Sequence, residues 1–480
     1  MNEIGYDFGM IGLGVMGSNL MLNMADHGFA VIGYDTNPQK TSLFEASASK
    51  NTIVKGVNTL SEMIDTLKVP RKIMMLVPAG NPVDSVIADL SRLLQKGDII
   101  IDGGNSHYID TLRRISQLKD KGFHFMGIGI SGGEEGARQG PSIMPGGDEE
   151  AYREVEPILK AVAAKVDNEP CVGYLGHAAA GHYVKMVHNG IEYAIMQLIS
   201  ECYDLMRNGI GLSNDEIHEV FNAWDNGDMK SFLLEISAAI FEKKDEKSPE
   251  NYLVDMVLDK AGAKGTGKWT SQEGLDLPMP IPTIDAAVVM RNLSSLIDER
   301  RQADSLYQTQ LQKIHMAKEE FVDLLHDAFY FATIISYAQG LAMLTTASME
   351  LKMDIPLPAV INVWRGGCII RSALLDYFKK AYENAGLKNL LLDKTIASLL
   401  KQKEQSAQKI ISLAALHNYP AAGFMSALNY YNAYRRKLLP TNLIQAQRDF
   451  FGAHTYERID TDGIFHTEWE TAPETVSTKM

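Results

Sequence analysis

Residues 7–18 read DFGMIGLGVMGS and place a G-x-G-x-x-G motif directly after a short apolar run. Ser18 to His27 then carries apolar residues at helical spacing, and Gly28 ends the helix. Glycines between a strand and a helix let a pyrophosphate approach the backbone N–H groups at the helix N-terminus. The alternative is a glycine-rich turn without a ligand. We predict a dinucleotide-binding turn made of Gly12, Leu13, Gly14, Val15, Met16 and Gly17.

A second apolar run, Phe29–Tyr34, ends at Asp35, 18 residues beyond Gly17. An acid at this position accepts hydrogen bonds from the adenosine ribose and repels a 2′-phosphate. Its alternative role is to cap a turn. No arginine lies between Gly12 and Arg71.

Three more apolar runs are each followed by a turn rich in glycine or proline: Lys72–Val77, Asp98–Ile101 and Phe123–Ile130. Strands that alternate with helices at this pitch predict a parallel, doubly wound sheet. Such a sheet binds ligands at the carboxyl ends of its strands. The turns at residues 102–105 (DGGN) and 131–138 (SGGEEGAR) therefore become candidate pocket walls, although either alone is more often a plain turn.

From about Gly181 the apolar spacing becomes helical, in the segments Tyr183–Met206, Asn214–Trp224, Ile284–Gln302 and Phe321–Ala347. The helical part is internally similar. The sequence around His188 returns around His326, and VFNAW ending at Trp224 returns as VINVW ending at Trp364. Two such units would bury faces that neither buries alone.

Lys185, His188, Asn189 and Glu192 fall at i, i+3, i+4 and i+7, so that a helix places them on one face. Their neighbours are apolar. Burial lowers the pKa of a lysine and raises that of a glutamate, which suits them as base and acid near neutrality. The alternative is a solvated helix face. The second copy argues against it, because Lys and Glu are absent there: its matching residues are Asp323, His326, Asp327 and Tyr330.

The 480 residues are 45% hydrophobic and 22% charged, which excludes a mostly disordered, collagen-like or coiled-coil chain. The net charge of −14 disfavours broad nucleic-acid binding. The three widely spaced cysteines predict neither a disulfide framework nor a CxxC metal site, which favours a reducing compartment. We find no run of about 18 apolar residues and no signal-like start, so we expect a cytoplasmic protein without membrane partners.

Seven segments closely resemble the decarboxylating 6-phosphogluconate dehydrogenase family, in the same order over essentially the whole chain: GLGVMGSNL, IIDGGNS, SGGEEGARQGPSIMPGG, GHYVKMVHNGIEY, GAKGTGKWT, RNLSSLIDER and QAQRDFFGAHTYER. The resemblance implies oxidation of 6-phosphogluconate to ribulose 5-phosphate and CO₂ with reduction of NAD(P), in the pentose phosphate pathway and without a metal. It also implies a homodimer with shared active sites. We predict an α/β Rossmann-type N-terminal domain (1–180), a large all-α duplicated helical domain (181–440) and an extended C-terminal tail (441–480) that reaches the partner subunit.

The resemblance assigns roles to individual residues. Lys185 resembles the general base that later acts as an acid, and Glu192 resembles the acid that protonates C1. Contacts to the substrate carboxylate and hydroxyls are implied for Asn105, Ser131, Gly132, Gly133, His188 and Asn189. The phosphate pocket is implied to contain Tyr193, Lys264, Thr266 and Arg291, with Arg448 and His454 from the other subunit.

One departure concerns the cofactor. NADP-using members of the family carry Asn-Arg-Thr or Asn-Arg-Ser after the second strand, where this chain has Asp35-Thr36-Asn37. A lysine common in the later loop, after the third strand, is replaced by Pro78 in Val77-Pro78-Ala79, which we also expect to line the cofactor site. Both changes remove positive charge, so Asp35 and Thr36 favour NAD, although NADP is the usual family cofactor and remains the alternative.

Two other functions compete with this prediction. A short-chain 3-hydroxyacid dehydrogenase of the same superfamily would share the glycine motif and a helical lysine, but not the duplicated unit or the QAQRDFFGAH segment. A catalytically inactive dinucleotide sensor would have no need of the Lys185 and Glu192 pair.

Overall fold

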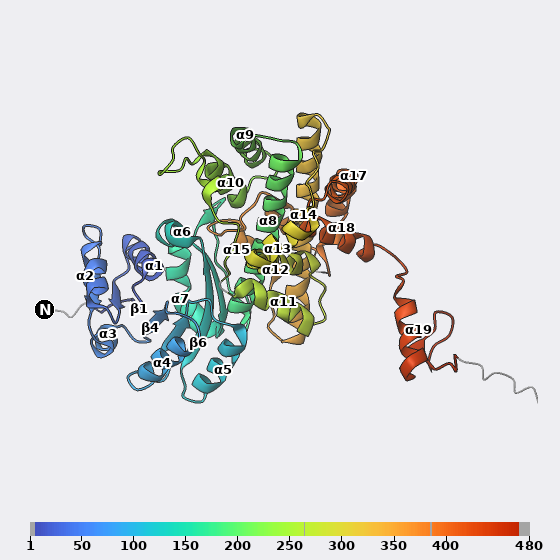
Figure 1. Ribbon diagram of the computed structural model, residues 1–480. Coiled ribbons are helices and arrows are strands. Elements are labelled where there is room, and N and C mark those ends of the chain that lie inside the picture. Colours follow the sequence, from blue (N-terminus) through green and yellow to red (C-terminus); the bar gives the residue numbers. More distant parts are fainter. Residues whose placement is uncertain (1–4, 264, 385, 470–480) are drawn as a thin grey trace, which may run out of the picture. The chain divides into compact units, whose positions relative to one another are not determined.

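The computed structural model describes residues 5–263, 265–384 and 386–469 (Figure 1). The chain forms two compact units, Met1–Leu428 and Asn429–Met480. The first unit contains the sheet and most of the helices. The second begins within the helix Ala422–Tyr434 and, in its described part, continues with one further helix and a small hairpin.

A seven-stranded sheet has the order β3-β2-β1-β4-β5-β6-β7. Its strands are β1 (Phe8–Ile11), β2 (Val31–Tyr34), β3 (Val54–Val57), β4 (Lys72–Met75), β5 (Ile99–Asp102), β6 (His124–Ser131) and β7 (Ser142–Gly147). The first six are parallel, as predicted, and β7 runs antiparallel to β6. The apolar pattern did not predict β3 or β7, because β3 is only partly buried and β7 contains a proline and two glycines.

Helices cover both faces of this sheet. They are α1 (Val15–Asp26), α2 (Pro38–Ala46), α3 (Leu60–Thr66), α4 (Asn81–Leu90), α5 (Tyr108–Lys119), α6 (Gly133–Gln139) and α7 (Glu149–Val162). Because neighbouring strand residues point to opposite faces, Met10 and Ile11 of β1 belong to two different core clusters. The strand order reverses beside β1, which lies between β2 and β4, and this is where such sheets bind ligands.

The remaining part of the first unit is helical, apart from the short hairpin β8 (Lys165–Val166) and β9 (Glu169–Pro170) that precedes it. Its helices are α8 (Ala180–Asp204), α9 (Asn214–Asp225), α10 (Phe232–Glu242), α11 (Thr266–Asp276), α12 (Pro282–Ser294), α13 (Ile297–Tyr307), α14 (Lys318–Glu350), α15 (Leu357–Trp364), α16 (Leu374–Ala381) and α17 (Lys394–Leu416). The boundary between the two units falls within α18 (Ala422–Tyr434). The single helix predicted over 284–302 is two helices, since the chain leaves helical geometry at Ser295 and Leu296.

The internal duplication is visible in the packing of two tryptophans. In each copy a long helix (α8 or α14) precedes a short helix (α9 or α15) that contains a tryptophan near its end. Trp224 of the first copy packs edge-on against His326 of the second, with ring centroids 5.4 Å apart. Trp364 of the second copy packs in the same way against His188 of the first, at 6.0 Å. The two copies therefore complete each other's cores.

Helix α14 is long and apolar enough to cross a membrane by length and composition alone. However, 94% of its most apolar 18-residue window is buried inside the protein, where it contacts α8 and α17. Its hydropathy is therefore that of a core helix.

Helix α8 lies directly against β6 and β7 because glycines remove the side chains between them. Along β6, Met126, Ile128 and Ile130 point into a core cluster, which leaves Gly127 and Gly129 on the opposite face. A Cβ atom at Gly129 would lie 2.4 Å from Cβ of Lys185. A Cβ atom at Gly181 would lie 2.2 Å from the carbonyl oxygen of Gly127.

The second unit contains α19 (Thr441–Gly452) and a hairpin of β10 (Tyr456–Glu457) and β11 (Ile464–Phe465). The predicted extended tail is therefore partly folded between residues 441 and 469, and its last residues, 470–480, lie outside the described part of the chain. Asp449 of α19 holds the unit together, because its carboxylate accepts hydrogen bonds from Thr455 N, Thr467 N, His466 Nδ1 and Trp469 Nε1. Burial alone would raise the pKa of Asp449, but these donors lower it to about 2.

Candidate active site

Lys185 lies on α8 where the helix crosses the face of β6 that carries Gly127 and Gly129. It is 7% exposed, which is rare for a lysine and costly for its charged form. Burial lowers the pKa of Lys185 below its usual value of 10.5, and the nearby Glu192 and Cys368 oppose that effect only in part. The neutral amine is therefore more accessible than in an exposed lysine, which favours a role as general base.

His188 is fully buried one turn further along α8. Its Nδ1 is 2.9 Å from Oδ1 of Asn189, and its Nε2 is 3.4 Å from Oγ of Ser131 at the end of β6. Burial and the neighbouring Lys185 lower the pKa of His188 well below its usual range. The imidazole is therefore neutral at physiological pH and serves as a fixed hydrogen-bonding group.

Glu192 completes the predicted stripe, with Oε2 3.8 Å from Nδ1 of His188. Burial raises the pKa of its carboxyl, although Lys185 and Arg291 act in the opposite direction. The stripe of α8 is thus a buried site whose lysine is biased towards its neutral form and whose glutamate is biased towards its protonated form. The two groups suit proton removal and proton delivery.

The first turn of α11 lies beside this stripe. The amide of Asn189 donates a hydrogen bond of 2.8 Å to Oγ1 of Thr266. The guanidinium of Arg291 on α12 lies 3.7 Å above the ring of Tyr193, and it donates to the carbonyl oxygen of Gly262. Thr266, Tyr193 and Arg291 are therefore gathered near one end of the stripe, whereas Lys264 lies outside the described residues.

The turn between β1 and α1 fits a dinucleotide. A Cβ atom at Gly12, where φ is +95°, would lie 2.5 Å from the carbonyl oxygen of Leu76, and one at Gly17 would lie 2.0 Å from that of Gly12. A Cβ atom at Gly14 would meet nothing within 4 Å. No side chain caps α1 at Gly14. The free N–H groups of its first turn therefore face open space, as a pyrophosphate requires.

Asp35 is anchored at the end of β2. Its Oδ2 accepts a hydrogen bond of 2.9 Å from Leu13 N, and its Oδ1 accepts one of 2.9 Å from Asn37 N. Nζ of Lys40 lies 3.4 Å from Oδ2 and its side chain is 47% exposed. Thr36 is exposed beside them, and Asn37 also caps α2.

The other predicted cofactor and substrate residues lie just beyond the carboxyl ends of the parallel strands, on loops or, for Gly133, at the start of α6. Val77, Pro78 and Ala79 follow β4, Asn105 follows β5, and Gly132 and Gly133 follow β6. Asn105 is exposed, although the loop around it is fixed by Asp102, which accepts hydrogen bonds from Gly104 N and Ser106 Oγ.

The sequence patterns did not identify one segment of this site. Cys368 is fully buried near enough to Lys185 to influence its pKa, and its thiol donates to the carbonyl oxygen of Trp364. A Cβ atom at Gly132 would lie 2.6 Å from the carbonyl oxygen of Gly367. No periodicity connects these residues with α8, because they come from a loop that lies about 180 residues away along the chain.

Arg448 and His454 belong to the second unit, where both are exposed. Nη1 of Arg448 is 3.2 Å from Oε1 of Gln445, and the ring of His454 packs edge-on against Phe451. Their guanidinium and imidazole groups are therefore accessible for an anion.

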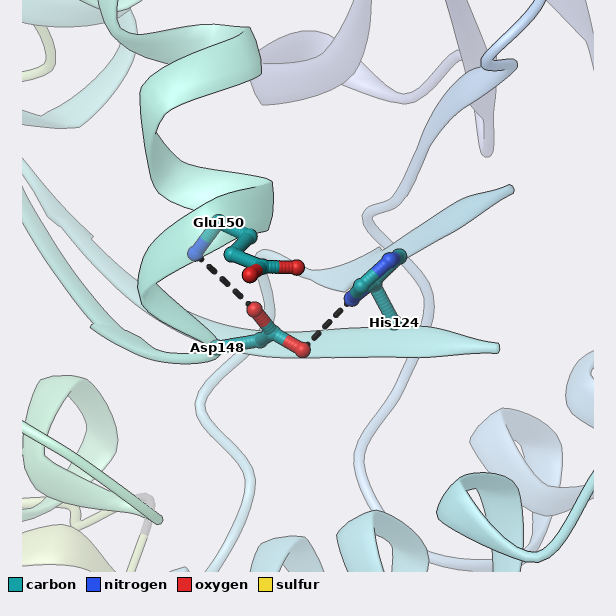
Figure 2. A group of neighbouring side chains, drawn as sticks. All are labelled: His124, Asp148 and Glu150. Carbon is teal, nitrogen blue, oxygen red and sulfur yellow. Dashed lines mark hydrogen bonds and ion pairs between the residues drawn. The ribbon is translucent and has the colours of Figure 1, made fainter. Parts of the chain in front are cut away.

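His124, Asp148 and Glu150 each offer a possible metal-ligand atom within 4.8 Å of the others (Figure 2). Oδ2 of Asp148 is 2.5 Å from Nδ1 of His124, while its Oδ1 accepts hydrogen bonds from Glu150 N and Ala151 N. Burial alone would raise the pKa of Asp148, but these contacts lower it. The carboxylate is engaged as the N-cap of α7, so we assign the cluster a structural role.

Comparisons with known proteins agree over both parts of the chain. A family model described as the NAD binding domain of 6-phosphogluconate dehydrogenase matches residues 7–176, and one described as the 6-phosphogluconate dehydrogenase C-terminal domain matches residues 181–469. The chain is 50% identical to the NADP(+)-dependent, decarboxylating 6-phosphogluconate dehydrogenase of Bacillus subtilis, covering 96% of this chain and 98% of that one. It is 46% identical to the decarboxylating enzyme of Lactococcus lactis subsp. lactis, with 97% and 99% coverage.

A solved structure of Plasmodium falciparum 6-phosphogluconate dehydrogenase has a TM-score of 0.94 and 44% identity, and covers 96% of this chain and 100% of that chain. That protein was determined in its apo form, with its cofactor NADP⁺ and with its substrate 6-phosphogluconate. The similarity includes the helical half, which distinguishes this chain from a short-chain 3-hydroxyacid dehydrogenase. The chain belongs to the 6-phosphogluconate dehydrogenase family.

Proposed function

We propose that this chain oxidises 6-phosphogluconate and decarboxylates the product to ribulose 5-phosphate, as an enzyme of the pentose phosphate pathway. The observation that carries the proposal is the buried stripe of α8, in which burial lowers the pKa of Lys185 and raises that of Glu192. The family membership of the chain supports the same reaction.

Lys185 acts first as a base. Its neutral amine accepts the proton of the C3 hydroxyl. A dinucleotide whose pyrophosphate is held at the glycine turn would supply the nicotinamide that accepts the hydride from C3. The neutral His188 and Ser131 orient the substrate without adding a charge to the site. We expect further contacts to the substrate carboxylate and hydroxyls from Asn105, Gly132, Gly133 and Asn189.

The product of this step is a β-keto acid, which loses CO₂ when the negative charge that develops on the keto oxygen is stabilised. Lys185, now protonated, donates a hydrogen bond to that oxygen. Glu192 then delivers a proton to C1 of the enediol, which its raised pKa favours. The steps need no metal, because the lysine supplies the positive charge.

The substrate phosphate is held at the α11 end of the stripe. Tyr193, Thr266 and Arg291 gather there, and Lys264 belongs to the same pocket by resemblance. Arginine suits this role because its guanidinium makes charge-assisted hydrogen bonds to a phosphate dianion.

We propose a homodimer in which Arg448 and His454 of one subunit complete the phosphate pocket of the other. The second unit leaves Leu443, Ile444, Phe450 and Phe451 between 54% and 72% exposed. Leu443, Phe450 and Phe451 line a groove of about 260 Å³. So small a unit does not bury these side chains within itself, and a second copy of the chain is the partner that the shared site requires. We propose that the chain consists of a dinucleotide-binding domain (1–180), a helical substrate and dimerisation domain (181–440) and a C-terminal tail (441–480).

We also propose that the enzyme prefers NAD. Asp35 repels a 2′-phosphate and accepts hydrogen bonds from a free ribose, while Thr36 and Pro78 supply no cation. Lys40 is the residue that opposes this preference, because its exposed amine lies beside Asp35. The free thiols of Cys171, Cys202 and Cys368 suit the reducing cytoplasm, where we expect the enzyme to work.

Replacing the base tests the reaction directly. Lys185→Met should lower turnover by about 10²–10⁴-fold or more, because no other group takes the C3 proton. Glu192→Gln should also slow the reaction. Turnover is followed by the absorbance of the reduced nicotinamide with 6-phosphogluconate as substrate. The control Lys268→Met removes an exposed lysine of α11 and should retain activity; near-normal turnover in Lys185→Met would refute the catalytic role.

Cofactor preference is measured as kcat/KM with NAD and with NADP. One repulsion and one missing charge-assisted contact are worth roughly 2–4 kcal/mol, so NAD should be favoured by about 30- to 1000-fold. Asp35→Asn combined with Thr36→Arg should move the preference towards NADP. An equal or higher value with NADP would contradict the proposal, and Lys40→Gln would then test whether Lys40 binds the phosphate.

Mixing two inactive variants tests the shared site. Lys185→Met and Arg448→Ala proteins, unfolded together and refolded, form mixed dimers in which one site retains both groups. Activity should return towards one quarter or less of the wild-type value, since about half of the dimers are mixed and each has one intact site. If mixed dimers form without recovery, Arg448 does not act on its neighbour.

A further inference from the structure

Glu273 of α11 is a buried carboxylate that the proposed reaction does not use. It is 5% exposed, and its Oε2 accepts a hydrogen bond of 2.6 Å from the phenol of Tyr108. Its Oε1 accepts a longer one, of 3.3 Å, from the phenol of Tyr183. No ion pair to Glu273 occurs among the residues that the structure describes. The two phenols, which are also buried, are therefore the groups that stabilise its charge.

Glu273 is the last in a row of contacts between α11 and α8. Asn189 donates to Thr266 at 2.8 Å, and one turn later Thr270 donates to the carbonyl oxygen of Met186 at 2.8 Å. Glu273 follows at i+7 from Thr266, on the same face of α11. The row runs from the proposed phosphate pocket to the far end of α11, so that the position of Thr266 depends on where the helix is held.

Tyr108 connects this row to the sheet. It begins α5, three residues after Asn105, which lies in the loop that follows β5. In the same segment, the ring of His107 packs edge-on against Trp269 of α11, with centroids 4.7 Å apart. The loop that carries Asn105 is therefore attached to α11 at two points, one polar and one aromatic.

The other end of α11 begins after Gly265, whose φ is +102°. Among the described residues, no side-chain hydrogen bond caps this first turn. The turn is held by the hydrogen bond from Asn189 to Thr266, by close packing of Gly267 against the ring of Tyr193, and by contacts made further along the helix.

We propose that Glu273, held by Tyr108, is a positioning residue that fixes the phosphate-binding turn of α11 relative to the Asn105 loop. The inference rests on the proposed function, because Thr266 and Asn105 contact substrate only if the chain acts on 6-phosphogluconate. Glu273 touches neither the substrate nor the cofactor in this account. It acts through the placement of Thr266 and Asn105.

The test compares Tyr108→Phe, Glu273→Gln and the double variant with the wild-type enzyme. Tyr108→Phe keeps the ring, which packs edge-on against Tyr183, and removes only the hydroxyl. The matched control is Tyr152→Phe on α7, which also removes a buried phenol that donates to a glutamate, here Glu156. We measure KM for 6-phosphogluconate, KM for the dinucleotide, kcat and Tm.

Each single variant should raise KM for 6-phosphogluconate by about 5- to 50-fold, with a smaller change in kcat and less than about a twofold change in KM for the dinucleotide. The double variant should resemble the single variants, because both substitutions remove the same hydrogen bond. The control should alter Tm without altering KM. Substrate KM within twofold of wild type in both single variants would overturn the inference, as would additive effects. Lack of wild-type activity on 6-phosphogluconate would instead overturn the proposed function.

Discussion

The direct contact of α8 with β6 and β7 is the constraint on which the rest of the site depends. Gly127 and Gly129 place no side chains at the part of β6 that meets α8, so the helix backbone reaches the strand and Lys185 is buried there. The energetic cost of burying an ammonium group appears as the lowered pKa of Lys185, which is the property that a base needs. A larger residue at Gly129 would displace the lysine. The contact between α8 and β6 therefore both packs the helix against the sheet and buries the amine of Lys185.

Local patterns predicted the parts of this arrangement that lie within one element. The glycine motif, the end of β2 at Asp35 and the polar stripe of α8 depend on spacings of a few residues, and the structure has each of them on the predicted strand, turn or helix. Strand β7 escaped prediction because Pro145 and two glycines resemble a loop, and only its pairing with β6 makes it a strand. Cys368 and Glu273 escaped because their positions depend on contacts between segments far apart in the chain.

The tail shows how a single buried group can organise a segment that was predicted to be extended. Asp449 accepts hydrogen bonds from four donors and so ties a helix to a hairpin. The two copies of the duplicated helical part share a packing role but differ in their polar residues. Trp224 and Trp364 each complete the core of the opposite copy, while only the first copy carries Lys and Glu on its polar stripe. In the proposed function, one long helix is specialised for chemistry and the other for packing.

The most direct test of this account is the ionisation of Lys185 in the folded protein. Heteronuclear NMR of protein labelled at the lysine side chains would follow each amine with pH, and the signal missing from Lys185→Met would identify Lys185. The account predicts that this signal titrates below 10.5, the usual pKa of a lysine, and below the exposed lysines, because the amine is buried against β6. Titration near 10.5, together with the exposed lysines, would contradict the claim that burial prepares the base.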